Sequence, residues 1–203
     1  MIINRPSKTR GFTLLEVIIA SAIVVVVGWL IVNFGIDLAV SNIRFNGSLL
    51  TQAQIHQTLQ IMVPEIRSAS QSNGGAYPIA TAGTSTLIFY SDIDRDGLFE
   101  RVRYFLNGST FSKGVIKPTG TPFVYPTSTE VVYDLVNTMI PGTIFAYYDE
   151  DARTSTSTPL SQPVDILRIK MVRITLIANQ GTTSTPSIVG VEDQATVRNL
   201  RYD

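Results

Sequence analysis

The 203-residue chain contains no cysteine, and this absence excludes several classes of protein. Without a thiol there is no disulfide framework, thiolate metal site, cysteine nucleophile or lipid-modified cysteine anchor. Histidine is almost as scarce, because His56 is the only one in the sequence. With a single histidine and no cysteine, a histidine-based catalytic triad or a zinc site is not expected. We therefore expect that the chain is not an enzyme and carries no catalytic cofactor.

Basic runs are absent from most of the chain. The sequence has 16 basic and 16 acidic residues, and residues 1–11 hold three of the basic ones and no acidic one. Removing those three leaves 13 basic against 16 acidic residues, a net charge of −3. Phosphate binding requires clustered lysine and arginine side chains. We expect no nucleic-acid contact from the chain beyond residue 11.

A long apolar run follows the basic leader, over residues 14–38. About 20 apolar residues are enough to cross a bilayer as a helix. A cleaved signal peptide is the alternative, with Ala20-Ser21-Ala22 as its cleavage site. That cut would leave an apolar stretch on the mature protein, so we favour a retained membrane helix. The cations precede the run, so the positive-inside rule places the leader in the cytoplasm and exports the remainder.

Glu16 is a carboxylate inside this apolar run. A charge at the centre of a bilayer costs about 2.5–3.5 kcal/mol, and such residues are functional candidates for that reason. The residue alone leaves two interpretations open. Glu16 either lies at the interface and caps the helix N-terminus, where the dipole favours an anion, or it has a function within the membrane.

The sequence around Glu16 resembles the cleavage and methylation motif of type IV prepilins and type II secretion pseudopilins, in the run Lys8-Thr9-Arg10-Gly11-Phe12-Thr13-Leu14-Leu15-Glu16-Val17. This resemblance implies that a prepilin peptidase cleaves between Gly11 and Phe12 and methylates the new amine of Phe12. It also implies that Glu16 pairs with the amine of a neighbouring subunit. The methylated amine stays cationic, and opposite charges in a dry helix bundle cost far less together than apart.

Helical spacing continues beyond the membrane segment. An apolar stripe recurs every three or four residues, at Ile55, Leu59, Met62, Ile66 and Ala69. This spacing predicts one helix from about residue 12 to about residue 70, whose second half packs on a folded domain. Pro64 lacks a backbone donor, so we expect a kink there.

From residue 74 the pattern changes to strand-like runs separated by turn residues, which indicates an antiparallel sheet. The predicted strands are 86–91, 101–106, 110–116, 130–136, 144–148, 166–177 and 196–202. A long helix followed by strands predicts an α+β fold with the helix packed on the sheet. We divide the chain into a leader, residues 1–11, a transmembrane and assembly helix, residues 12–40, and an exported pilin-like domain, residues 41–203.

The strand-rich half also resembles the J-type minor pseudopilins, in the segments Val132–Val136, Ile144–Asp149, Val172–Leu176 and Val197–Leu200. The resemblance implies a tip-type minor subunit of a type II secretion pseudopilus, inserted once in the inner membrane before assembly. Its partners would be other pilin or pseudopilin subunits, the prepilin peptidase and membrane lipid. One alternative is a minor pilin of a type IV pilus, used for adhesion, motility or DNA uptake. Another is a monomeric membrane-tethered binding domain, although a monomer gains nothing from Glu16.

An acidic segment joins two predicted strands, in the run Asp92-Ile93-Asp94-Arg95-Asp96-Gly97. Three carboxylates at alternate positions before a glycine match the first half of an EF-hand calcium loop. The second half does not match, because an arginine stands where the twelfth-position glutamate is expected. We favour a polar hairpin turn, with a calcium site as the alternative. In that case Asp92, Asp94 and Asp96 would hold Ca²⁺ together with the Leu98 carbonyl and Glu100.

Overall fold

The computed structural model describes residues 11–149, 158–179 and 188–200, and for residues 42–49 it describes the backbone only. The chain divides into two compact units, Met1–Phe45 and Asn46–Asp203. The elements among the described residues are α1 (Leu14–Arg67), β1 (Ile79–Ala82), β2 (Thr86–Ser91), β3 (Glu100–Asn107), β4 (Thr110–Ile116), η1 (Thr127–Thr129), β5 (Val131–Val136), β6 (Phe145–Tyr148), η2 (Ile166–Arg168), β7 (Met171–Asn179), β8 (Ile188–Thr196) and η3 (Arg198–Leu200). A helix combined with antiparallel strands confirms the predicted α+β class.

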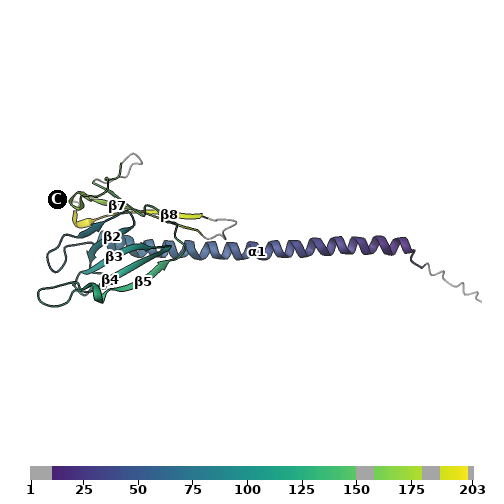
Figure 1. Cartoon of the computed structure of the whole chain (residues 1–203), viewed down its shortest axis with the longest axis horizontal. Helices are drawn as coiled ribbons and strands as arrows, with labels where there is room; N and C mark the ends of the chain where they lie inside the picture. Colours follow the sequence, from purple (N-terminus) through teal and green to yellow (C-terminus); the bar gives the residue numbers. More distant parts are fainter. Residues whose placement is uncertain (1–10, 150–157, 180–187, 201–203) are drawn as a thin grey trace, which may run out of the picture. The chain divides into compact units, whose positions relative to one another are not determined.

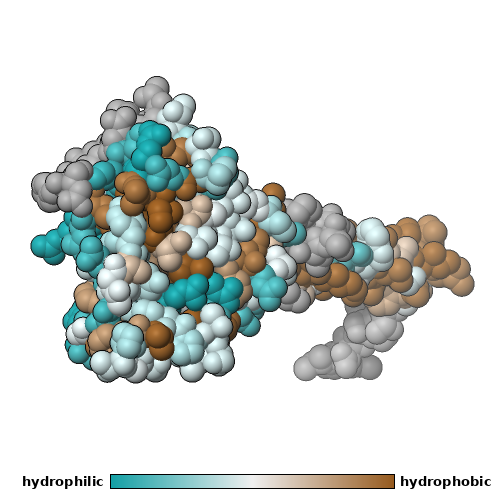
Figure 2. Space-filling view, turned by 60° about the vertical axis from the view of Figure 1, so that its left-hand side comes forward, coloured by the Kyte–Doolittle hydropathy of each residue, from teal (hydrophilic) through white to brown (hydrophobic). Residues whose placement is uncertain are grey.

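The first part of α1 is long and apolar enough to cross a membrane. Leu14–Ser41 has 28 residues with a mean hydropathy of 2.7, and none of its most apolar window is buried. At 1.5 Å per residue this segment is about 42 Å long, more than the roughly 30 Å of a hydrocarbon core. Apolar residues predominate on the part of its surface that is visible in Figure 2. Such a surface requires lipid or other apolar helices around it.

The last part of α1, in the second unit, carries the predicted apolar stripe into the core. All five stripe residues are buried: Ile55, Leu59, Met62, Ile66 and Ala69. His56 lies off the stripe and is exposed, as expected for a polar residue on the other face. The helix continues through Pro64 and ends at Arg67, within one turn of the proline.

The larger sheet contains five strands in the order β1-β2-β3-β4-β5, each antiparallel to its neighbours. Figure 1 labels β2 to β5 of this sheet. Spatial order follows chain order, so neighbouring strands are joined by local connections. The predicted alternation is confirmed in β3, where Val102 and Tyr104 are buried and Arg101 and Arg103 are half-buried. One face of the sheet therefore contributes to the core while the other meets solvent.

The smaller sheet has the order β6-β7-β8 and is also antiparallel. It is tied to the larger sheet near the start of β6, where the Phe145 amide donates to the Thr84 carbonyl at 2.9 Å. The Tyr147 hydroxyl, buried in the same region, donates to the Gly83 carbonyl at 2.7 Å, and burial raises the pKa of Tyr147. The larger apolar cluster among the described residues contains residues of α1 and of both sheets.

A largely buried polar cluster joins α1 to the larger sheet. The Glu65 carboxylate accepts hydrogen bonds from the Lys113 ammonium of β4 at 2.5 Å and from the Tyr104 hydroxyl of β3 at 2.7 Å. The Lys113 and Glu65 side chains are only 11% and 14% exposed. Burial, together with the negative charge of Glu65, raises the pKa of Tyr104 far above its usual value. Each carboxylate oxygen thus has a partner, and the helix is held in one position on the sheet.

Removing Glu65 should destabilise the second unit strongly. In Glu65→Ala a buried ammonium and a buried phenol lose their acceptor, and breaking such a pair costs about 3–5 kcal/mol. At roughly 2–4 °C per kcal/mol, the unfolding midpoint of the detergent-solubilised chain should fall by about 10 °C. Arg168→Ala is the control, because the Arg168–Asp149 ion pair is exposed and should be worth less than about 1 kcal/mol. Equal losses in the two variants would contradict the buried pairing.

Two predicted strands differ from the structure at their ends. The strand predicted at 166–177 starts only at Met171, because residues 166–168 form η2. The Asp165 carboxylate accepts the Leu167 amide at 3.1 Å, and this local bond favours a turn over an extended backbone. Of the strand predicted at 196–202, residues 201 and 202 lie outside the described part, and only Thr196 lies in a strand, at the end of β8, because residues 198–200 form η3. There the Asn199 side chain donates to the Ala69 carbonyl just beyond α1, at 2.8 Å.

Two strands were not predicted. β1 has only four residues and lies at an edge of the larger sheet. β8 contains Gly190, Glu192 and Asp193, which are rare in strands, and forms by pairing along the whole length of β7. The antiparallel strands accordingly form two sheets, where the sequence indicated one.

Candidate functional site

Thr13 and Glu16 cap the N-terminus of α1 reciprocally. Thr13 Oγ1 accepts the Glu16 amide at 3.3 Å, and Glu16 Oε2 accepts the Thr13 amide and the Thr13 hydroxyl, both at 3.1 Å. This geometry is a capping box with Thr13 as the N-cap and Glu16 at the third helical position. All hydrogen bonds described at the carboxylate use Oε2. The second oxygen, Oε1, remains available within the described part of the chain.

The predicted cleavage bond lies directly before this cap. Gly11 and Phe12 precede the helix and are exposed, with Phe12 87% accessible. A Cβ added at Gly11 would meet nothing within 4 Å. An enzyme can therefore reach the backbone on both sides of the bond. Cleavage there would place the new amine on Phe12, one residue before the cap; leader residues 1–10 lie outside the described part.

The cleavage bond and the capping box lie in one segment that matches a known protein family. Residues 6–32 match the family described as the prokaryotic N-terminal methylation motif. The matched segment contains the Gly11–Phe12 bond, Glu16 and the beginning of the apolar helix. This N-terminal segment is type IV pilin-like. No curated protein matches the chain.

The pilin-type motif has direct implications for processing and location. It implies cleavage by a prepilin peptidase and assembly with other pilin subunits. Together with the apolar segment Leu14–Ser41 it is consistent with a single-pass, membrane-anchored protein. The capping box shows that Glu16 caps its own helix, and the charge pair with another subunit stays a prediction.

The loop between β2 and β3 brings three of the five predicted calcium ligands together. Asp92, Asp94 and Glu100 each offer one carboxylate oxygen, and the three oxygens lie within 4.8 Å of one another. Asp96 is outside this group, and its Oδ1 accepts the Leu98 amide at 2.8 Å. The cluster differs from the predicted one in this respect, because Asp96 stabilises the turn of the loop.

Backbone amides and one lysine balance the exposed charges of this loop. The Asp92 carboxylate accepts the Asp96 and Gly97 amides, both at 3.1 Å. The Lys117 ammonium, just after β4, donates to Asp94 and lies 3.8 Å from Asp96. The hydrogen bond from Lys117 holds the pKa of Asp94 below its usual value. In this state the ammonium neutralises part of the acidic loop.

Glu100 is the buried member of the cluster. It begins β3 and has no exposed surface. Its Oε2 accepts the Ile93 amide at 3.0 Å, whereas its buried Oε1 has no hydrogen-bond partner among the described residues. Burial raises the pKa of Glu100, and the charges of Asp94 and Asp96 raise it further. A buried polar atom without a partner costs about 1–3 kcal/mol, and a bound cation or a proton would remove that cost.

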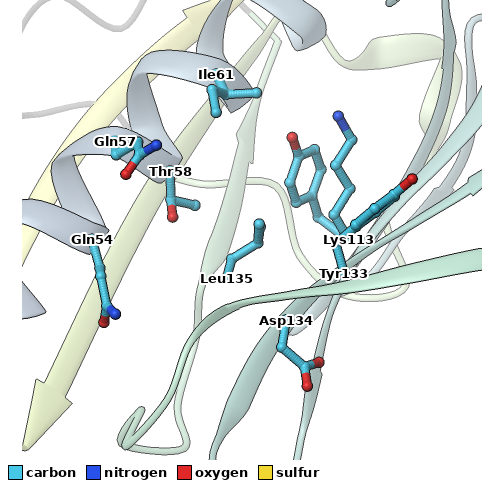
Figure 3. A pocket seen from close by; sticks show the side chains of 9 residues that line it. Gln54, Gln57, Thr58, Ile61, Lys113, Tyr133, Asp134 and Leu135 are labelled. Carbon is cyan, nitrogen blue, oxygen red and sulfur yellow. The ribbon is translucent and has the colours of Figure 1, made fainter.

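A groove lies between α1 and the edge strand β5 of the larger sheet (Figure 3). The helix contributes amide and apolar side chains, including Gln57 and Ile61, and β5 contributes Leu135 and Asp134. Asp134 accepts a hydrogen bond from the Ser112 hydroxyl at 2.8 Å.

Lys113 also lines the groove, and its ammonium is paired with the Glu65 carboxylate of α1. Both charged side chains of the groove thus have partners within the fold.

Two residues of these sites were not singled out from the sequence. Thr13 could have been found, because a threonine three residues before a glutamate at the start of an apolar run is the capping-box pattern. Lys117 could not, because it follows a different strand from the loop that it neutralises. The pairing of Arg101 with Ile116 brings the beginning of β3 beside the end of β4, and with it Lys117 beside the loop.

Proposed function

We propose that the chain is a minor subunit of a type IV pilus-like filament, of the type II secretion pseudopilus kind. Before assembly it would sit in the inner membrane, with its leader in the cytoplasm and the second unit exported. The observation that carries the proposal is a carboxylate, Glu16, in the first turn of a helix whose most apolar window has no buried residue.

The first turn of α1 is suited to accept a cation from another chain. In a lone subunit Glu16 can remain near the membrane interface, where the capping box holds its Oε2. In a filament the apolar helices would pack together, and an isolated carboxylate among them would be costly. The methylated amine of a neighbouring Phe12 would neutralise it through the free Oε1. Assembly would thus couple burial of Leu14–Ser41 to formation of this pair.

The minor, tip-type position rests on the resemblance of the strand-rich half to J-type pseudopilins. The segments that carry it fall mainly in β5, β6 and β7. These strands belong to both sheets of the second unit. A type IV pilus would use the same N-terminal motif. Only the resemblance of the second unit to pseudopilins therefore favours a secretion function over a pilus function.

Cysteine cross-linking should separate a minor subunit from a major one. The natural chain has no cysteine, so Ala39→Cys places a single thiol on the exposed apolar segment. A minor subunit should form discrete cross-links with single-cysteine variants of other pilin-like subunits and no ladder with itself. A ladder of self-linked chains would identify a major subunit. Absence of every cross-link in membranes that contain the other subunits would favour the monomeric anchor.

Deletion of the gene should then separate the two filament types. A pseudopilus subunit should be required for release of secreted proteins, which accumulate in the periplasm of the deletion strain. Surface pili, motility and DNA uptake should remain. The opposite pattern would assign the chain to a type IV pilus. Complementation with Gly28→Ala, which leaves Gly11, Phe12 and Glu16 unchanged, should restore the wild-type phenotype in either case.

A further inference from the structure

We propose that Asp92, Asp94 and Glu100 bind one calcium ion in the loop between β2 and β3. Calcium–oxygen distances of roughly 2.3–2.6 Å mean that two oxygens on one ion lie at most about 5 Å apart. The three carboxylate oxygens lie within 4.8 Å of one another, close to the separations that one ion imposes, so small side-chain movements would bring all three into contact with it. Ca²⁺ takes six to eight oxygen ligands, and carboxylates are its usual protein ligands.

Glu100 supplies an independent indication of a ligand. The acidic loop by itself could be a solvated turn, because its aspartates are exposed or half-buried and have amide or lysine partners. Glu100 has no exposed surface, and its Oε1 is buried without a partner among the described residues, beside two further carboxylates. Three carboxylates this close together repel one another. A divalent cation would provide a partner for the buried oxygen and would also offset this repulsion.

Lys117 is the competing cation in the ion-free protein. Its ammonium donates to one carboxylate oxygen of Asp94. To bind the ion, Asp94 must direct one of its two carboxylate oxygens toward it. Calcium binding would therefore weaken or displace the Lys117 contact. The loop also contacts its surroundings through Phe99, whose amide donates to the Asn73 side chain at 2.7 Å and whose carbonyl accepts the Tyr125 hydroxyl at 2.8 Å. A bound ion would stiffen this junction of three loops.

Calcium should raise the unfolding midpoint of the full-length protein in detergent. We expect one site with a Kd of roughly 10⁻⁴–10⁻³ M, as in exposed extracellular calcium modules. At a calcium concentration ten times the Kd, the unfolding midpoint should be about 3 °C higher than that of the chelator-treated protein. Magnesium at the same concentration should give a smaller rise, because it demands octahedral geometry and keeps its waters. Equal midpoints in calcium and in chelator would overturn the proposal.

Glu100→Gln separates a calcium ligand from a structural carboxylate. The glutamine can accept the Ile93 amide and donate to the neighbouring aspartates, so the variant should fold and melt at or above the chelator-treated wild type. Its calcium response should be lost, with affinity at least tenfold weaker. Asp96→Asn is the matched control and should change affinity by less than about threefold, since Asp96 lies outside the cluster. A full calcium response in Glu100→Gln would refute the assignment.

Lys117→Gln tests the competition directly. Removing the ammonium frees Asp94 and takes a positive charge from the site, so calcium affinity should rise severalfold. The midpoint in chelator should fall, because Asp94 loses its counterion. A decrease in calcium affinity would show that the lysine does not compete with the ion, and would contradict the site as described.

Discussion

Gly11→Val should leave the leader on the protein and keep the chain out of filaments. A Cβ at Gly11 meets nothing within 4 Å, and the residue precedes α1, so the substitution does not disturb the fold. Any effect of the substitution must arise where a peptidase binds the backbone on both sides of the Gly11–Phe12 bond. A branched side chain there blocks the approach that glycine permits. Intact-mass measurement of membrane-extracted protein should find an uncut, unmethylated chain.

Gly28→Ala is the matched control for this experiment. A Cβ at Gly28 also meets nothing within 4 Å, and the residue lies inside α1. Alanine is better than glycine in a helix by about 1 kcal/mol, so the variant should be cut and methylated like the wild type. Normal processing of Gly11→Val at Phe12 would show that the peptidase has no need of the glycine.

Glu16→Val should be cut, inserted and folded, yet should fail to enter filaments. In the assembled state the substitution would leave the amine of a neighbouring Phe12 buried without a partner. Breaking a buried pair costs about 3–5 kcal/mol, which corresponds to at least a hundredfold loss of incorporation. The lone subunit loses only its capping interaction, worth about 1 kcal/mol. Incorporation is measured by co-purification with tagged partner subunits from cross-linked membranes.

Two further variants separate the charge of Glu16 from its capping role. Glu16→Gln can still accept the hydrogen bonds from Thr13, because glutamine also completes a capping box. It lacks the charge, so it should assemble as poorly as Glu16→Val. Thr13→Ala loses the cap and keeps the charge, and it should assemble within severalfold of wild type. Wild-type incorporation of Glu16→Gln would leave Glu16 as a helix cap only.

The helix and the central strands follow from patterns that burial imposes on neighbouring residues. The five-residue apolar stripe predicts the buried face of α1, because all its members meet the same core. The alternation in β3 predicts one buried face for the same reason. Such periodicity depends on local geometry alone, so it can be read without knowledge of the partners.

Features that depend on distant partners could not be read in this way. β8 pairs with β7 although its own residues disfavour a strand, and the pairing outweighs the propensity. The partner of Glu65 is Lys113, which lies on a strand far along the chain. Glu100 Oε1 has no hydrogen-bond partner among the described residues because of how β3 is buried, which also depends on distant parts of the chain. The sequence identified the acidic loop, and the fold determined which of its carboxylates come together.

The N-terminal residue of the natural protein, extracted from membranes of the organism that makes it, tests the central claim most directly. A pilin-like subunit should begin at Phe12, and its amine should carry a methyl group, as the match over residues 6–32 implies. N-terminal sequencing combined with intact-mass measurement reads both features. An uncut chain that starts at Met1, or a mature chain that starts at Ile23 after Ala22, would contradict the filament account.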